Sequence, residues 1–286
     1  MVTAPDDRRG PRYGAGLLEH QHPLELRRLR ALEVFADPAS RAALEHCGPR
    51  PGTRCLELGA GAGSVARWLA ERCAPGEVVA TDLDTSLLPR DVPNLTVLRH
   101  DVAQDDFPDG SFDLLHARSL LEHLPEREEV LARMVRWTAP GGRICVDGIT
   151  VTPPLDAPDA LRRCVTGLND LAGGRMGTAV RWATDLPDLL ARAGLGHIGL
   201  AYTPGLVGPG GNADAFLRLC LEQVGPAMVG QGLVRRQDLD AYLHLPPGDA
   251  RPAPVFLVVS AWGRRPRNRP RPGQPANPSL SARSSP

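Results

Sequence analysis

The sequence predicts an α/β protein with a mostly parallel sheet that carries helices on both faces. Three observations predict this class. Short apolar strand segments alternate with amphipathic helical segments from Thr53 to Val146, a glycine-rich turn joins the first strand to its helix, and further apolar strands follow nearer the C-terminus. With 286 residues, of which 42% are hydrophobic, the chain is long enough for one large domain of this kind or two small ones.

The N-terminal part of the chain is predicted to be helical. Residues 1–12 lack apolar periodicity and are expected to form a flexible N-terminus, whereas residues 13–52 hold leucines at helical spacing. One helical segment covers Gly16–Ala36 and is broken by Pro23, and a second short helix covers Pro38–His46. A turn rich in glycine and proline then separates this part from the sheet.

The main domain is expected over residues 53–263. Its first strands are short apolar runs, predicted at Arg54–Leu58, Glu77–Thr81, Leu95–Arg99, Phe112–Ala117 and Arg143–Val146. The helices between them show apolar residues on one side only, and we expect them at Ser64–Ala74 and Glu126–Trp137. This alternation is typical of a parallel sheet that is covered on both faces.

The C-terminal part adds helices, two strands and a tail. An insert at residues 153–182 contains one amphipathic helix, and further helices are predicted at Pro187–Ala193, Ala213–Val224 and Gln237–His244. Strands are expected at Gly196–Tyr202 and Val255–Ala261. Residues 264–286 are rich in arginine and proline without apolar periodicity, so we expect a disordered tail.

Composition and charge exclude several classes of function. The chain has 33 acidic and 33 basic residues and therefore no overall field that would attract nucleic acid. All basic residues are arginines, which excludes chemistry that requires a lysine. No apolar run is long enough to span a membrane and the N-terminus does not resemble a signal peptide, so we expect a cytoplasmic monomer or homodimer. The six cysteines lack metal-ligand spacing, so no metal is expected.

The glycine-rich turn is the most informative segment. It reads Gly59-Ala60-Gly61-Ala62-Gly63 and links a strand to a helix, which allows the backbone to approach a ligand and to present free N–H groups. Such turns also occur as tight packing corners. The spacing G-x-G-x-G differs from the dinucleotide pattern G-x-G-x-x-G, because Ser64 stands where the last glycine would fall. This difference argues against NAD or FAD.

Two carboxylates follow the next strands. Asp82 ends the second strand, 19 residues beyond Gly63, where a carboxylate can accept hydrogen bonds from a ribose diol. Asp101 follows the third strand, where it can accept from an exocyclic amine while Val102 offers its backbone. Either carboxylate can instead cap a helix, which is the interpretation we favour for Asp84.

In these motifs the chain resembles the class I S-adenosylmethionine-dependent methyltransferases. The matching segments are ELGAGAG, ATDLD, RHDV, FDLLHARSLLEHLP and PGGR, in order between Thr53 and Asp147. The resemblance implies a Rossmann-like sheet of seven strands with the last one antiparallel, and S-adenosylmethionine as cofactor. It assigns the amino-acid end, the ribose and the adenine of that cofactor to the matching positions, which are Glu57, Gly59, Ala60, Gly61, Gly63, Asp82, Leu83, Asp101, Val102 and His116.

The resemblance is closest to the small-molecule branch, which includes ubiquinone-type and natural-product methyltransferases. The motif D/N-P-P-Y/F of base-modifying enzymes is absent, since Ala117-Arg118-Ser119-Leu120 stands in its place. We therefore expect a small, hydrophobic acceptor and no nucleic acid. The inserts 153–182 and 203–235 are expected to wall the acceptor pocket, although core packing explains their larger apolar residues equally well, namely Met176, Trp182, Phe216 and Met228.

Several residues are candidates for the chemistry. His123 follows the fourth strand and is the predicted general base, although a role at the start of a helix is equally compatible. In this branch the N-terminal segment folds over the cofactor, so residues 13–52 are expected to form a lid. Its Tyr13 and Arg28 are candidates for the cofactor and His20 and His22 for the substrate, with a solvated helix face as the alternative.

Three functions remain open at this point. The first is methyl transfer to an O, N or C atom of a small acceptor in natural-product biosynthesis. The second keeps the cofactor site but catalyses a cyclisation or another non-methylating reaction. The third is a non-catalytic subunit that binds S-adenosylmethionine.

Overall fold

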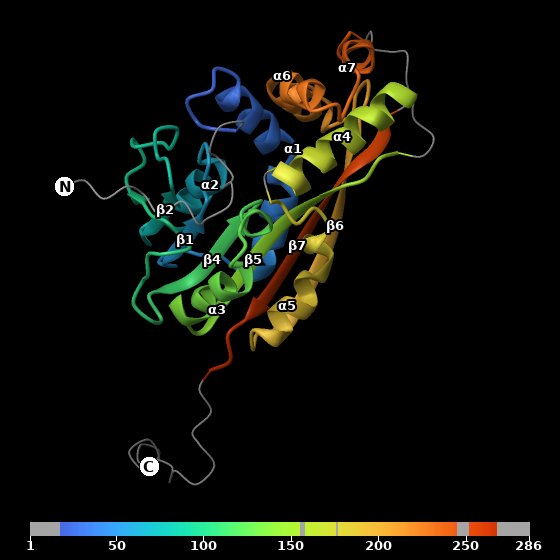
Figure 1. The fold of residues 1–286 in the computed structure, drawn as a ribbon. Helices are drawn as coiled ribbons and strands as arrows, with labels where there is room; N and C mark the ends of the chain where they lie inside the picture. Colours follow the sequence, from blue (N-terminus) through green and yellow to red (C-terminus); the bar gives the residue numbers. More distant parts are fainter. Residues whose placement is uncertain (1–17, 155–157, 176, 245–251, 268–286) are drawn as a thin grey trace, which may run out of the picture.

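A computed structural model describes residues 18–154, 158–175, 177–244 and 252–267 (Figure 1). Its centre is a seven-stranded sheet with strand order β3-β2-β1-β4-β5-β7-β6. The strands are β1 (Cys55–Leu58), β2 (Val78–Asp82), β3 (Leu95–Arg99), β4 (Phe112–Arg118), β5 (Thr138–Val151), β6 (Gly196–Val207) and β7 (Ala253–Arg264). The first five run parallel, and β7 is antiparallel to both of its neighbours. The predicted seven-stranded sheet is therefore confirmed.

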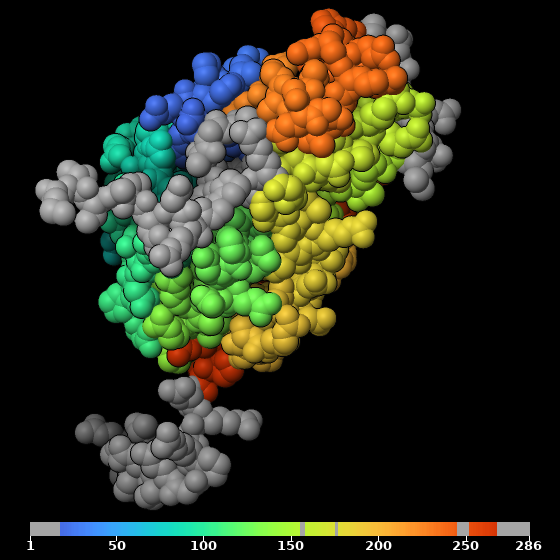
Figure 2. Space-filling view, in the orientation of Figure 1, coloured from blue at the N-terminus to red at the C-terminus, as the bar shows by residue number. Residues whose placement is uncertain are grey.

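Helices cover both faces of this sheet. They are α1 (Glu25–Cys47), α2 (Ser64–Cys73), α3 (Arg127–Trp137), α4 (Asp159–Arg175), α5 (Leu186–Arg192), α6 (Asp214–Gly230) and α7 (Arg236–Leu243). Side chains from α1 and α2 pack on one face, and those from α3 and α5 pack on the other. At one end of the molecule α4, α6 and α7 lie together (Figures 1 and 2), and their side chains pack with residues near the start of β7. No described helix has both the length and the apolarity needed to cross a membrane.

The first helix differs from the prediction. Two helices separated near Pro38 were expected, but α1 runs unbroken from Glu25 to Cys47 with Pro38 inside it. Proline leaves the carbonyl four residues earlier without its N–H partner. That carbonyl belongs to Val34, which is 74% exposed, so water can replace the missing donor.

Residues 13–52 were expected to form a lid, and the described part of that range contributes both to the core and to the wall of a cavity. Phe35 of α1 is fully buried, and its ring lies 6.1 Å from Phe216 and 5.6 Å from Phe256. A helix whose apolar side is part of the core belongs to the folded domain rather than to a mobile cover. The described part that precedes α1, residues 18–24, consists of turns, while residues 1–17 lie outside the described residues.

The C-terminal boundary also differs. The tail was expected from residue 264, but Arg264 is the last residue of β7 and its Nε donates to the carbonyl of Gly141 at 3.0 Å. The backbone N–H of Arg265 donates to Gly142 at 2.9 Å. Pro140, Gly141 and Gly142 lie within β5. Hydrogen bonds between these residues and the end of β7 therefore order both segments. Residues 268–286 lie outside the described residues.

Candidate functional site

A cavity of about 350 Å³ lies at the carboxyl ends of the parallel strands. Its wall is formed by residues 18–21, by the adjacent side of α1, by the glycine-rich turn, and by the segments that follow β2, β3 and β4. In open α/β sheets this edge is where ligands bind. Its volume lies in the range of small-molecule pockets.

The glycine-rich turn has the geometry that the sequence predicted. Gly59, Gly61 and Gly63 adopt φ values of 63°, 57° and 86°, which side chains disfavour. Gly59, Ala60 and Gly61 line the cavity. Gly63 is not among the lining residues, and a Cβ there would lie 2.5 Å from Cδ of Pro89. Gly63 thus maintains the tight turn into α2, while the first three residues face the ligand space.

Carboxylates from α1 meet the N-terminus of α2. The backbone N–H of Ser64 donates to Glu33 Oε1 at 3.2 Å, and the hydroxyl of Ser64 donates to Asp37 Oδ1 at 2.8 Å. Negative groups are favourable at a helix N-terminus, where the backbone N–H groups lack partners. The first turn of α2 is therefore already occupied by acidic side chains of the protein.

Asp82 occupies the position after β2 that the sequence predicted. Its Oδ2 accepts from the N–H of Gly61 at 2.9 Å, which ties this carboxylate to the glycine-rich turn. Burial raises the pKa of Asp82, and the hydrogen bond from Gly61 and the nearby His20 oppose that effect. Leu83 and Asp84 also line the cavity. Asp84 accepts from Ser86 N at 2.9 Å within a turn, so the helix that it was expected to cap is absent.

Asp101 and Val102 line the same cavity from the segment after β3. Asp101 Oδ1 accepts from the N–H of Ala103 at 2.9 Å, which orients the carboxylate. The predicted cofactor residues of the glycine-rich turn, of β2 and of β3 are thus brought together around one space. His100, which the sequence analysis did not select, lines it as well, and its ring stacks on Phe107 with centroids 4.5 Å apart.

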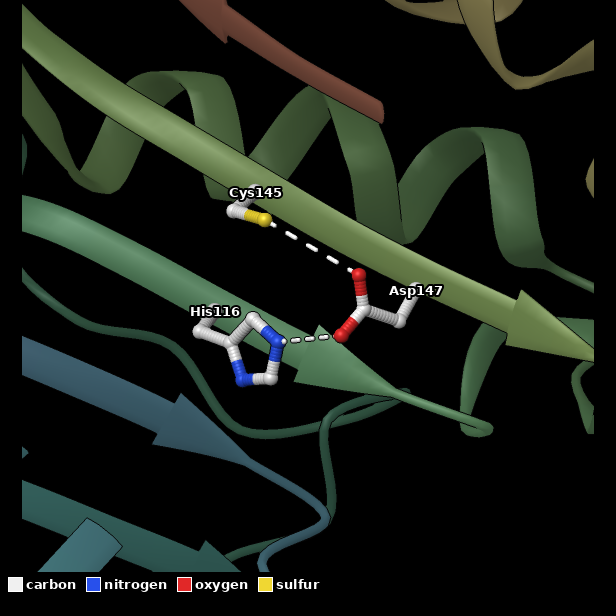
Figure 3. A group of neighbouring side chains, drawn as sticks. All are labelled: His116, Cys145 and Asp147. Carbon is white, nitrogen blue, oxygen red and sulfur yellow. Dashed lines mark hydrogen bonds and ion pairs between the residues drawn. The ribbon is translucent and has the colours of Figure 1, made fainter. Parts of the chain in front are cut away.

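Glu57 and His116 lie elsewhere. His116 on β4 is fully buried between two carboxylates. Its Nδ1 lies 2.7 Å from Glu57 Oε2, and its Nε2 lies 3.0 Å from Asp147 Oδ2 (Figure 3). Neither Glu57 nor His116 is among the residues that line the cavity. Their strand positions direct both side chains to the sheet face beneath α1, away from the residues that line the cavity.

The ionisation of this buried group follows from its charges. Burial opposes a charged imidazole, but the two carboxylates prevail and raise the pKa of His116 to about 10. Cys145, whose Sγ lies 3.9 Å from Asp147 Oδ1, has a raised pKa and stays a thiol (Figure 3). His116, Cys145 and Asp147 are residue types that metals take, with candidate ligand atoms within 4.8 Å of one another. In the structure the imidazole lies between the carboxylates of Glu57 and Asp147, so the group forms a buried ion-paired cluster.

The N-terminal candidates separate into two groups. His20 lines the cavity with Nδ1 3.9 Å from Asp84 Oδ2, which places it beside the carboxylates after β2. Arg28 lines the cavity as well, and its Nε and Nη2 donate to Glu25 at 2.9 and 2.6 Å. His22 is not a lining residue, because its Nδ1 accepts from the N–H of Leu24 at the start of α1. Tyr13 lies outside the described residues.

His123, the predicted base, does line the cavity. Its Nδ1 lies 2.9 Å from Thr178 Oγ1. Burial, with smaller contributions from Arg28 and Arg127, lowers the pKa of His123 to about 3. The imidazole is therefore neutral at pH 7 but a poor proton acceptor.

The inserts were predicted to wall an acceptor pocket, and their described residues lie away from the cavity at the strand ends. None of the described residues of 153–182 or 203–235 lines the cavity. Instead they contact residues that do line it: Thr178 Oγ1 lies within hydrogen-bonding distance of His123. Gln223 Nε2 donates to Glu25 Oε2 at 2.9 Å. The apolar residues proposed for the acceptor pocket are instead core residues, namely Trp182, Phe216 and Met228, while Met176 lies outside the described residues. Core packing, the alternative explanation, holds for these three residues.

Arg118 and Ser119 line the cavity and were missed as site residues. They follow β4, and the sequence analysis used this segment only to exclude base-modifying enzymes. Ser119 has a positive φ of 48°, which is uncommon outside glycine and is enriched at functional sites. A polar pair directly at the carboxyl end of a parallel strand was the signal that could have identified both.

Known proteins resemble this chain in sequence. A family profile described as a methyltransferase domain matches residues 56–146. Nocamycin O-methyltransferase from Saccharothrix syringae is 35% identical over 129 residues, which is 42% of this chain and 46% of that protein. Demethylmenaquinone methyltransferase from Beutenbergia cavernae is 36% identical over 124 residues, which is 42% of this chain and 50% of that protein. The chain thus spans about half the length of the curated relatives it matches.

Solved structures resemble it in fold. Phosphoethanolamine N-methyltransferase 2 from Haemonchus contortus has a TM-score of 0.53 at 17% identity, with 83% of this chain and 57% of that chain covered. A methyltransferase structure from Bacillus halodurans has a TM-score of 0.53 at 15% identity, and the match covers 80% of this chain and 99% of that chain.

In residues 56–146 the chain matches a methyltransferase domain, and its sheet order and its relatives resemble those of the class I S-adenosylmethionine-dependent methyltransferases. The two relatives named above carry the names of small-molecule methyltransferases, the branch that the motifs of this chain resemble. The cofactor of this family is S-adenosylmethionine.

Proposed function

We propose that this protein transfers the methyl group of S-adenosylmethionine to an O, N or C atom of a small, hydrophobic acceptor in natural-product biosynthesis. One observation carries the proposal: the glycine-rich turn and the carboxylates after β2 and β3 line a single cavity. The O-methyltransferase among its relatives supports the class of product.

The lining residues suit this cofactor chemically. Asp82 and Asp101 offer carboxylate oxygens to ribose hydroxyls and to an adenine amine, since both groups are hydrogen-bond donors. Gly59, Ala60 and Gly61 leave room for the ligand to approach the backbone, because none carries a side chain beyond Cβ. Leu83 and Val102 offer apolar contacts beside these polar groups. We assign the cofactor to these seven residues.

When bound, S-adenosylmethionine supplies a methyl group activated by a sulfonium centre. The protein then has to align an acceptor atom with that carbon, and such alignment alone reaches effective molarities of ~10⁵–10⁸ M. His123 stays neutral in this environment, with its pKa lowered to about 3. We therefore assign His123 to orientation of the acceptor by hydrogen bonding rather than to proton abstraction, and His20 to the cover of the ribose site.

The decisive experiment combines binding and turnover. Isothermal titration with S-adenosylhomocysteine should give saturable binding in the micromolar range, and a library of phenols, amines and enols with methyl-labelled cofactor should give a labelled product. Binding with a converted but unlabelled acceptor would replace methyl transfer by a non-methylating reaction, whereas binding without conversion of any acceptor would favour a non-catalytic subunit. Absence of binding, together with a response to NAD, would refute the proposal.

We also propose that the protein acts in the cytoplasm as a monomer or homodimer and does not bind nucleic acid. The balanced charge of the chain and the absence of a base-modifying motif support this. Size-exclusion chromatography with light scattering tests the oligomeric state. A gel-shift titration with duplex DNA and with RNA should show no complex at physiological salt.

A further inference from the structure

Arg118 places a cationic group in the wall of the cofactor cavity. It is the last residue of β4, and its neighbour Ala117 is paired with Leu58 of β1, so Arg118 lies beside the start of the glycine-rich turn. Its side chain is 10% exposed and it lines the cavity. A buried guanidinium requires a negative partner or strong hydrogen bonds to be stable there.

The guanidinium is held in place from the side of α1 and α2. Its Nη1 donates to Asp37 Oδ1 at 2.8 Å and to Ser40 Oγ at 3.2 Å, and its Nη2 reaches Ser64 Oγ at 3.5 Å. These three hydrogen bonds of Arg118 to described residues use its two terminal nitrogens, and none of them uses Nε. Because an arginine has more N–H donors than these bonds occupy, Arg118 retains the capacity to bind a further acceptor.

Its charge is also incompletely neutralised. Asp37 contacts a second arginine through its other oxygen, since Arg41 Nη2 donates to Oδ2 at 2.9 Å. One carboxylate is thus shared by two guanidinium groups. By contrast Arg28, the other arginine among the described lining residues, forms a two-bond pair with Glu25. The positive charge available in the cavity therefore lies at Arg118.

We propose that Arg118 binds the carboxylate of the cofactor's amino-acid moiety. It would make the cavity selective for an adenosine thioether that carries an α-amino acid over one that lacks it. The inference rests on the proposed function, and it replaces Arg28 by Arg118 as the partner of that carboxylate. The two cavity carboxylates Asp82 and Asp101 then face the hydroxyl and amine donors at the other end of the ligand, so each polar group of the ligand meets its complement.

Two ligands separate this role from general cofactor binding. S-adenosylhomocysteine carries the carboxylate, whereas 5′-methylthioadenosine has the same nucleoside and sulfur without the amino acid. In isothermal titrations Arg118→Gln should weaken S-adenosylhomocysteine at least tenfold and change the affinity for 5′-methylthioadenosine less than twofold. Arg118→Lys should lie between the wild type and the glutamine variant, because it keeps the charge but not the planar fork.

Arg72→Gln is the matched control. It removes a guanidinium that pairs with Glu45, and Arg72 is 50% exposed and does not line the cavity. Both affinities should remain within twofold in this variant. Circular dichroism establishes that each variant is folded. If Arg118→Gln does not fold, Asp37→Asn serves instead, because it loosens Arg118 and should weaken S-adenosylhomocysteine selectively.

The outcomes separate the inference from the proposed function. Equal weakening of both ligands by Arg118→Gln, or an unchanged ratio of their affinities, would overturn the role of Arg118 and leave the methyltransferase proposal intact. In the fallback, an Asp37→Asn variant with an unchanged ratio would do the same. If the wild type binds neither ligand, the proposed function itself is refuted.

Discussion

Replacement of His116 by glutamine is expected to destabilise the fold strongly. His116 is fully buried with carboxylates 2.7 and 3.0 Å from its two ring nitrogens. Glutamine carries no positive charge, so Glu57 and Asp147 would remain as neighbouring buried charges without compensation. Removal of one partner from a buried ion pair typically costs ~3–5 kcal/mol.

The ionisation of His116 gives a second route to the magnitude. Its pKa is raised from 6.5 to about 10, and at ~1.36 kcal/mol per pH unit this difference corresponds to about 5 kcal/mol. Because the folded pKa lies above the unfolded value, the stabilisation is complete below pH 6.5. It is lost progressively as the pH rises through the folded pKa near 10.

Urea denaturation followed by circular dichroism measures this loss. At pH 6 we expect the free energy of unfolding of His116→Gln to be ~3–5 kcal/mol below that of the wild type, with a smaller difference at pH 10. The double variant with Asp147→Asn should recover part of the loss, since it removes one of the uncompensated charges. His244→Gln, at an exposed histidine, is the control. A loss below ~1 kcal/mol, or one independent of pH, would refute this account of the buried group.

Three further predictions concern the cavity. Asp82→Asn should weaken the binding of S-adenosylhomocysteine by ~1.5–3 kcal/mol in isothermal titration, because a buried acceptor for hydroxyl groups is lost. Asp84→Asn, at a side chain that is 43% exposed, should leave this affinity unchanged, and the reverse order of effects would move the role to Asp84. His123→Gln should leave the shape of the pH profile of kcat unchanged between about pH 5 and 9, since the wild-type imidazole with a pKa of about 3 does not titrate there. If the wild-type profile falls on its acidic side and the variant's does not, His123 is the base after all. Removal of residues 1–24 should weaken the cofactor and lower the melting temperature only slightly, through the loss of the buried Leu18. Removal of residues 1–30 should lower the melting temperature much further because it also takes away the buried Glu25 and Arg28; equal melting temperatures of the two variants would contradict the assignment of α1 to the core.

The elements that the sequence predicted well are those whose signal is local. Each parallel strand is a short apolar run next to a turn, and the strand ends at Leu58, Thr81 and Arg99 were predicted within one residue of the structure. The course of α1 was not predictable in this way. A proline normally ends a helix, and only the exposure of Val34 in the folded protein explains why Pro38 is tolerated.

The residues of the candidate site also differ in whether a local sequence signal identifies them. Gly59, Asp82 and Asp101 stand directly at strand ends, so strand order alone brings them together. Glu57 on β1 and His116 on β4 lie within their strands, where the alternation of side chains turns both toward the sheet face under α1. The position of Arg118 at a strand end was visible in the sequence, but its partner was not, because Asp37 is distant in sequence and becomes a neighbour only when α1 packs.

The charges around the cavity also explain which nucleotides it can take. A free helix N-terminus after a glycine-rich turn binds phosphate, but here Glu33 and Asp37 already occupy the first turn of α2. Seven carboxylates and two guanidinium groups line the cavity, and the acidic members are Glu19, Glu25, Glu33, Asp82, Asp84, Asp101 and Glu126. A pyrophosphate would have to displace Glu33 and would lie in an acidic environment, whereas a cationic sulfonium is favoured by it. The same loop geometry that serves dinucleotides in other folds is therefore restricted here to a nucleoside without phosphate, and Arg118 remains as the place for a single carboxylate.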